Sequence, residues 1–290
     1  MTHQSIGIFA KTFPRLSIES NLDAVAGYGL SVIQYNMACA GLPSLPDEIS
    51  SERATRIGVA AAARGIRVAA ISSTFNMIHP DVEQRRRGLR GLRAIAGACA
   101  ALGTRCITLC TGTRDAEDMW RGHPDNSSPQ AWTELLASME AAVVIAEEFD
   151  IVLGIEPEVA NVIDSPARAQ LLLREMRSPR LKIVLDPANL FRPGEVVHQH
   201  RVLAAAFDVL APHTIMAHAK DVVESNGEIR HVAAGRGRLD YSFYLSLLRQ
   251  VRVPLVAHGL SEQEVAWSLA FLRATAEGSN RQRLQRIGAS

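Results

Sequence analysis

The sequence predicts a closed (β/α)₈ barrel, because short apolar segments alternate with longer helical segments along nearly the whole chain. Eight apolar segments occur, and each is almost continuously apolar, as expected of a parallel strand covered on both faces. Parallel strands need crossover helices, so eight unbroken repeats favour a closed barrel. An open doubly wound sheet is the alternative, but the first strand leads into AKTFPR and not into a GxGxxG motif.

The predicted strands are four or five residues long, and most of them end at or just before polar side chains. In chain order they are Ile6–Ala10, Ser31–Tyr35, Arg67–Ile71, Cys106–Cys110, Val152–Glu156, Lys182–Asp186, Ile215–His218 and Leu255–His258. The helical segments between them have recognisable ends. These ends are Asp47 and Gly65, Asp81 and Gly103, Pro129 and Phe149, Ser165 before Pro166, and Ser261 with Glu264 as a capping box.

Length and composition indicate one globular domain. A barrel needs roughly 250 residues, and the chain has 290 without a break in composition. We therefore assign residues 1–277 to the barrel and residues 278–290 to a polar, basic C-terminal tail. The net charge of +1 argues against a nucleic-acid partner.

The cysteines and the apolar segments bear on the compartment. The four cysteines form no CxxC pair, which favours buried, reduced thiols. The N-terminus does not resemble a signal peptide, and no apolar run approaches the roughly 20 residues that span a membrane. We expect a cytoplasmic protein that does not bind membranes and that can form a homo-oligomer.

Four successive predicted strands end at residues that can bind a metal ion: Glu156, Asp186, His218 and His258. Neighbouring strands lie about 4.8 Å apart, so these side chains can converge at the carboxyl-end mouth, where barrel enzymes place their active sites. The mixed oxygen and nitrogen set suits Mn²⁺, which we expect, and also Mg²⁺, Co²⁺ or Zn²⁺. Taken singly, these residues could instead be a helix cap, a turn former, a core histidine and a strand end.

At these residues the sequence resembles the xylose isomerase-like TIM-barrel superfamily, the sugar-phosphate isomerase and epimerase group. The resemblance is carried by GIEPE, VLDPANL, HAKD and GRGRLDY, and it extends from GIFAKTF to about Arg273. It implies that Glu156, Asp186 and His218 are metal ligands. It also implies that Lys220 and Asp221 correspond to a family Lys–Asp pair, and that Arg236 of a glycine-containing loop holds an anionic or hydroxylated end of the substrate.

One position departs from the family pattern. Many members end the eighth strand with a glutamate that serves as fourth ligand and second acid/base, whereas this chain has His258. We expect Glu156 or Glu158 to act near the substrate C–H bond and His258 to be a ligand or the complementary acid/base. Further predicted substrate contacts are Asn36, His79, Glu158, Asn189, Lys220 and Arg236.

The function expected from these residues is that of a divalent-metal-dependent isomerase or epimerase. It would act on a sugar or sugar-derived polyol through a metal-stabilised enediolate. The chemical alternative is a lyase or dehydratase on a keto-sugar or inositol-like substrate. Two other classes stay open, an apurinic endonuclease-like repair enzyme and a non-catalytic sugar-binding barrel. Fold alone decides none of these.

Overall fold

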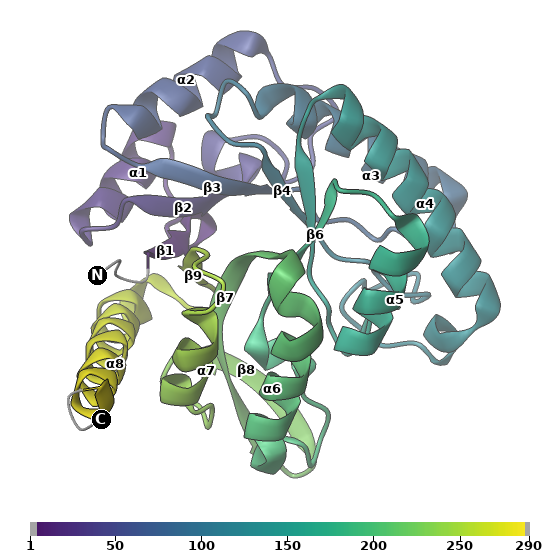
Figure 1. The fold of residues 1–290 in the computed structure, drawn as a ribbon. Coiled ribbons are helices and arrows are strands. Elements are labelled where there is room, and N and C mark those ends of the chain that lie inside the picture. The colour runs from purple at the N-terminus through teal and green to yellow at the C-terminus, as the bar shows by residue number, and fades with distance from the viewer. Residues whose placement is uncertain (1–4, 288–290) are drawn as a thin grey trace.

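The computed structural model describes residues 5–287, with side chains described for residues 5–278. Its strands form a closed ring in the order β1-β2-β3-β4-β5-β6-β7-β9, because β6 pairs with β7 and β9 pairs with both β7 and β1. All pairs around this ring are parallel. The predicted (β/α)₈ barrel is confirmed, and Figure 1 shows the helices surrounding the strands.

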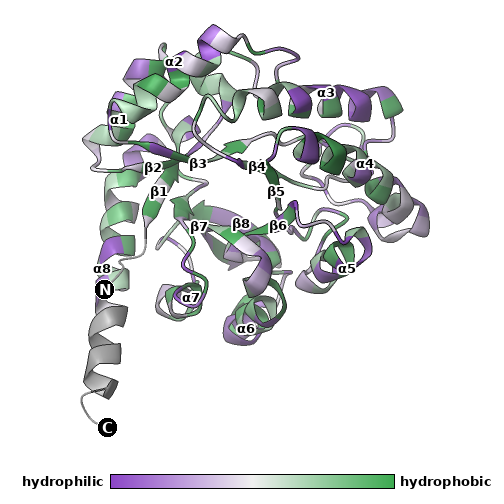
Figure 2. Ribbon diagram, turned by 45° about the horizontal axis from the view of Figure 1, so that its top comes forward, coloured by the Kyte–Doolittle hydropathy of each residue, from purple (hydrophilic) through white to green (hydrophobic). Residues whose placement is uncertain are grey.

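Each predicted strand matches an observed one to within a few residues, except that β7 is much longer. The barrel strands are β1 (Ile6–Phe9), β2 (Val32–Tyr35), β3 (Arg67–Ser72), β4 (Cys106–Leu109), β5 (Val152–Ile155), β6 (Leu181–Leu185), β7 (Thr214–Ser225) and β9 (Leu255–Ala257). They are mostly hydrophobic (Figure 2) and largely buried, since helices cover one face and the barrel interior covers the other.

Most of the helices begin where a short polar side chain caps them. They are α1 (Ile18–Gly27), α2 (Ser51–Ala62), α3 (Val82–Ala98), α4 (Pro129–Glu148), α5 (Pro166–Met176), α6 (Gln199–Leu210), α7 (Tyr241–Leu248) and α8 (Glu262–Ile287). Asp81 and Ser165 cap α3 and α5 as predicted, each accepting a bond from a backbone N–H of the first turn. The helix expected after Asp47 begins later, because Ser50 is its cap.

The sequence analysis did not anticipate the hairpin beside the barrel mouth. Strand β7 continues past His218 to Ser225 and pairs antiparallel with β8 (Glu228–Ala233). The two strands join at Asn226 and Gly227, whose φ values of 54° and 76° suit the tight Asn-Gly turn of a hairpin. This hairpin carries His231 to the mouth of the barrel.

The C-terminal segment is helical for most of its length. The predicted boundary between residues 277 and 278 falls inside α8, which continues to Ile287 and projects from the barrel (Figure 1). The last residues of the predicted tail, 288–290, lie outside the described residues.

All four cysteines are free thiols. Within residues 5–287, no helix combines the length and apolarity that a membrane span requires.

Candidate active site

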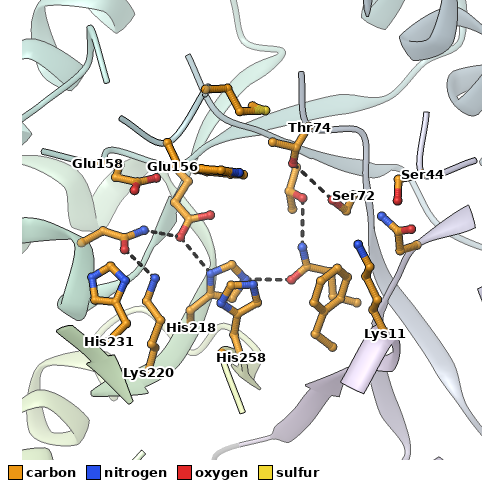
Figure 3. A pocket seen from close by; sticks show the side chains of 18 residues that line it. Lys11, Ser44, Ser72, Thr74, Glu156, Glu158, His218, Lys220, His231 and His258 are labelled. Carbon is orange, nitrogen blue, oxygen red and sulfur yellow. Dashed lines mark hydrogen bonds and ion pairs between the residues drawn. The ribbon is translucent and has the colours of Figure 1, made fainter. Parts of the chain in front are cut away.

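A pocket of about 460 Å³ opens at the carboxyl ends of the barrel strands. Figure 3 shows two unlike walls: ionisable side chains gather on one side, whereas Ser44, Ser72 and Thr74 lie on the other with Lys11. Its lining comprises Phe9, Lys11, Gln34, Asn36, Ser44, Ser72, Thr74, Thr108, Met119, Trp120, Glu156, Glu158, Asn189, His218, Lys220, His231, His258 and Gly259. The predicted site residues Asn36, Glu156, Glu158, Asn189, Lys220, His218 and His258 are all among them.

Three of the four predicted metal ligands converge beside this pocket. One donor atom from each of Asp186, His218 and His258 lies within 4.8 Å of the other two. Asp186 Oδ1 accepts a bond from the Ala188 N–H at 2.9 Å, and the buried Oδ2 faces Lys220 Nζ at 3.1 Å. The Nδ1 atom of His258 is buried without a hydrogen-bond partner. Unsatisfied buried donors and acceptors are rare, and a carboxylate with two imidazoles fits a divalent ion.

Glu156 lies against this group without belonging to it. Its Oε1 atom is 3.1 Å from His218 Nδ1 and accepts a hydrogen bond of 2.8 Å from the side-chain N–H of Asn189. Burial opposes protonation of His218, but Glu156 and then Asp186 outweigh it and raise the pKa of His218. The carboxylate of Glu156 is thus held in one orientation at the edge of the pocket.

Lys220 supplies a buried positive charge inside the same centre. Its Nζ atom donates to Asn189 Oδ1 at 2.5 Å and lies 3.1 Å from Asp186 Oδ2. Burial disfavours ionisation of both partners, yet their attraction lowers the pKa of Asp186 and raises the pKa of Lys220. A buried pair of this kind fixes positions more than it stabilises the fold, because both charges lose their hydration.

The pKa values of Glu158 and His258 are shifted in opposite directions, and both shifts favour the neutral form. Burial, reinforced by the charge of Glu156, raises the pKa of Glu158 to about 7, so that its carboxyl can exchange a proton near neutrality. Burial, followed by the charges of His218 and Lys220, keeps the pKa of His258 well below 6.5. Its neutral ring stacks on His218 with centroids 4.7 Å apart. A neutral ring suits a metal ligand better than a proton donor.

Two of the predicted substrate contacts lie away from the pocket. His79 Nε2 is 3.1 Å from the carbonyl oxygen of Ala116, and its Nδ1 accepts the backbone N–H of Asp81, so both nitrogens stabilise loops. The guanidinium of Arg236 lies 3.9 Å above the ring of Trp267 on α8. Neither residue lines the pocket. Their positions therefore give no support to the predicted contacts with substrate.

The pocket also contains residues that sequence reasoning missed. Gln34 and Thr108 are polar side chains in the apolar strands β2 and β4, and both are buried. A polar residue in a strand that is otherwise buried was the signal available for them. His231 was missed because it is brought in by the unexpected hairpin. Partial burial and then the charge of Lys220 lower the pKa of His231.

Asp221 serves the loop after β8 and not the pocket. Its carboxylate accepts the backbone N–H groups of Val222 at 2.8 Å, Gly235 at 2.9 Å and Leu239 at 3.0 Å. A Cβ atom at Gly237 would come within 2.2 Å of Asp221 Oδ1 and 2.3 Å of the Val222 carbonyl oxygen. The loop can therefore pack against the Asp221 carboxylate only if residue 237 is glycine.

We expect Gly237→Ala to lower the free energy of unfolding by roughly 1–3 kcal/mol, because a methyl group has no room there. Gly97→Ala is the matched control, since its added Cβ would meet Phe149 at 3.5 Å, an ordinary contact, within helix α3. Urea unfolding monitored by circular dichroism measures both variants. Equal midpoints for Gly237→Ala and the wild-type protein would contradict this account of the loop.

Comparison with known proteins assigns this chain to a family. The family model described as "Xylose isomerase-like TIM barrel" matches residues 22–274. The chain belongs to this family. The match spans β2 to α8, and with them all the ligand candidates. No functionally curated protein matches the sequence.

Solved structures of similar fold cover nearly the whole of this xylose isomerase-like chain. A xylose isomerase domain protein from Planctomyces limnophilus is 18% identical, with a TM-score of 0.74 and coverage of 96% of this chain and 99% of its own. The 3-keto-D-glucoside 4-epimerase of E. coli is 17% identical, with a TM-score of 0.71 and coverage of 93% and 99%. A family protein from Mycobacterium smegmatis in complex with magnesium is 14% identical, with a TM-score of 0.68 and coverage of 96% and 98%.

Proposed function

We propose that this protein is a divalent-metal-dependent isomerase or epimerase of a sugar or sugar-derived polyol. The observation that carries the proposal is the convergence of Asp186, His218 and His258 beside two pocket carboxylates, Glu156 and Glu158. The magnesium complex and the epimerase among the proteins of similar fold support it.

The metal would be held by Asp186, His218 and His258, with Glu156 as the adjacent carboxylate. Such an ion would satisfy the buried His258 Nδ1, which has no hydrogen-bond partner, and would add to the charge of Lys220 that faces Asp186 Oδ2. When bound, a divalent ion polarises a substrate carbonyl and lowers the cost of removing a proton from the neighbouring carbon. We propose Mn²⁺, since two imidazoles and carboxylate oxygen form an intermediate donor set.

The opposite wall suits a polyhydroxylated substrate. Ser72, Thr74 and Asn36 present hydroxyl and amide groups to the pocket, and each can both donate and accept hydrogen bonds. Ser72 Oγ and Thr74 Oγ1 lie 3.2 Å apart, within reach of neighbouring hydroxyls on one sugar. Phe9 and Trp120 add apolar faces to the same pocket. Lys11 lies on the same side, and the uncharged hydroxyl and amide groups around it favour hydroxyl groups as the main recognised feature.

The two carboxylates take different parts in proton transfer. Glu156, fixed through Oε1 by Asn189 and next to His218, is placed to remove the proton from a substrate carbon. Glu158, with a pKa of about 7, is suited to exchange a proton with the neighbouring substrate oxygen. Both follow β5, and no other carboxylate lines the pocket in the described part of the chain.

Elimination is the second candidate reaction, and the replacement of a second carboxylate by His258 favours it. A two-sided epimerisation needs an acid on the face opposite Glu156, whereas isomerisation or loss of a β-leaving group does not. All three reactions begin with removal of the same proton, so product analysis has to separate them.

Incubation of the Mn²⁺-loaded protein with a panel of ketoses, 3-keto-glycosides and inosose-type cyclic ketones in D₂O tests the proposal. Proton NMR and mass spectrometry are expected to show deuterium incorporated at the carbon next to the carbonyl, without loss of mass from the carbon skeleton. Loss of water or of a glycosyl group would assign a lyase instead. No exchange with any member of the panel, with metal bound, would contradict the proposal.

The shifted pKa of Glu158 predicts a pH dependence. If Glu158 accepts a proton in its ionised form, kcat/KM rises with pH through about 7 and levels off above it. Glu158→Gln should remove this limb and lower kcat by roughly 10²–10⁴-fold. Because the folded-state pKa is raised, ionisation of Glu158 costs stability as pH rises from about 4.5 through about 7. The variant should therefore melt higher than wild type at pH 8 but not at pH 4.

A further inference from the structure

A series of side-chain hydrogen bonds along the pocket lining connects Thr108 with the candidate metal centre. The Gln34 side-chain N–H donates to Thr108 Oγ1 at 3.0 Å, and Gln34 Oε1 lies 2.7 Å from His218 Nε2. On the other side of the same ring, His218 Nδ1 is 3.1 Å from Glu156 Oε1 and 3.7 Å from Asp186 Oδ2. Each nitrogen of His218 therefore faces a different partner.

The orientation of the Gln34 amide determines which nitrogen of His218 carries the proton. A carbonyl oxygen can only accept, so the Nε2 atom facing Gln34 Oε1 must be the N–H. The Glu156 carboxylate on the other side can also only accept, so without a metal Nδ1 donates to it; once Nδ1 gives up that proton to bind a metal, the remaining proton stays on Nε2 against Gln34. Were the amide turned around, its N–H₂ would face Nε2, the proton would lie on Nδ1, and Nδ1 could not bind a metal.

We propose that Gln34 is a positioning residue that holds the ring of His218 in the tautomer whose Nδ1 is free to bind the metal. The inference rests on the proposed function, and it assigns Gln34 a role through His218 and not on the substrate. Burial supports it, because Gln34 is 3% exposed and His218 is 1% exposed, so a hydrogen bond between them is largely shielded from solvent. Outer-shell partners of metal-bound histidines act in this way.

The neighbouring aromatic ring restricts His218 further. His258 stacks on His218 at an interplanar angle of 10°, and Phe9 lies 5.4 Å from His258 between ring centroids. The stack fixes the plane of the His218 ring, while Gln34 fixes its tautomer. These two restraints are separate, so a change at Gln34 should leave the stacking in place.

Two variants of Gln34 separate an acceptor role from a packing role. Gln34→Leu removes the acceptor and leaves the His218 N–H unpaired, whereas Gln34→Glu keeps an acceptor at the same reach. By calorimetry with Mn²⁺ alone on chelator-treated protein, we expect Gln34→Leu to bind about 10–100-fold more weakly than wild type. Gln34→Glu is expected to keep most of the wild-type affinity. Gln130→Leu, the same exchange at an exposed glutamine of α4 that does not line the pocket, is the control and should bind as wild type does.

Nitrogen-15 NMR of the imidazole in metal-free protein, at a pH where the ring is neutral, gives an independent readout. Wild type should show His218 protonated on Nε2, and Gln34→Leu should show a shift toward the Nδ1–H form. If Gln34→Leu keeps both the wild-type Mn²⁺ affinity and the tautomer, the role of Gln34 is overturned while the proposed function stands. If wild type itself binds no metal, the proposed function fails, and the tautomer measurement alone decides on Gln34.

Discussion

Asp186→Asn is expected to weaken Mn²⁺ binding by more than the roughly 10–100-fold that loss of an outer-shell partner costs. Asp186 is completely buried, and one of its carboxylate oxygens lies within 4.8 Å of a ring nitrogen of both His218 and His258. An amide at this position is uncharged and offers a weaker oxygen donor to a divalent cation. Calorimetric titration of chelator-treated protein with Mn²⁺ measures the effect.

The same substitution also leaves Lys220 without its carboxylate partner, which would lower stability for a reason unrelated to metal. Thermal unfolding without metal measures this part, and the double variant Asp186→Asn/Lys220→Met removes the unpaired charge. Asp164→Asn is the matched control, because Asp164 pairs with Arg192 at 2.6 Å outside the pocket. Wild-type Mn²⁺ affinity in a folded Asp186→Asn protein would remove Asp186 from the ligand set.

Glu156→Gln is expected to lower kcat by about 10²–10⁴-fold, the usual contribution of a general base. Glutamine nearly preserves the shape of the side chain and can still accept a hydrogen bond from Asn189, yet it cannot take a proton from carbon. We expect the loss in both turnover and solvent deuterium exchange, because both require the same proton removal. The pH limb assigned to Glu158 disappears only with the variant at 158.

Metal affinity shows whether Glu156 acts only as the base or also as a metal ligand. If Glu156 acts only as the base, Glu156→Gln keeps bound Mn²⁺ while losing turnover, in agreement with its position outside the Asp186, His218 and His258 group. If it is also a ligand, affinity and turnover fall together. Substantial activity in Glu156→Gln would contradict the proposed chemistry. Glu140→Gln is the matched control, because Glu140 lies on α4 and does not line the pocket.

The barrel was predictable from the sequence because its strands are almost continuously apolar and most of them end at or just before polar residues. This pattern placed Asp186, His218 and His258 at neighbouring strand ends, where the structure brings them together. What periodicity could not supply was the direction of side chains beyond the strand ends. Arg236 belongs to the predicted loop, but that loop turns it onto Trp267.

The remaining misses have identifiable physical causes. The hairpin that carries His231 departs from strict strand–helix alternation, although Asn226–Gly227 between two strand-like segments is a strong turn signal. Gln34 was overlooked because it is enclosed in the apolar strand VIQY, where hydropathy alone treats it as an exception. Its importance depends on a contact with His218, 184 residues away in sequence, which only the folded barrel creates.

The most direct test of the metal centre is anomalous diffraction from crystals of the protein soaked in Mn²⁺. We expect one strong anomalous peak within coordination distance of Asp186, His218 and His258, roughly 2.0–2.2 Å from each donor atom. A soaked crystal without density between these side chains, or with manganese bound only at other places on the protein, would contradict the account of this pocket as a metal-dependent active site.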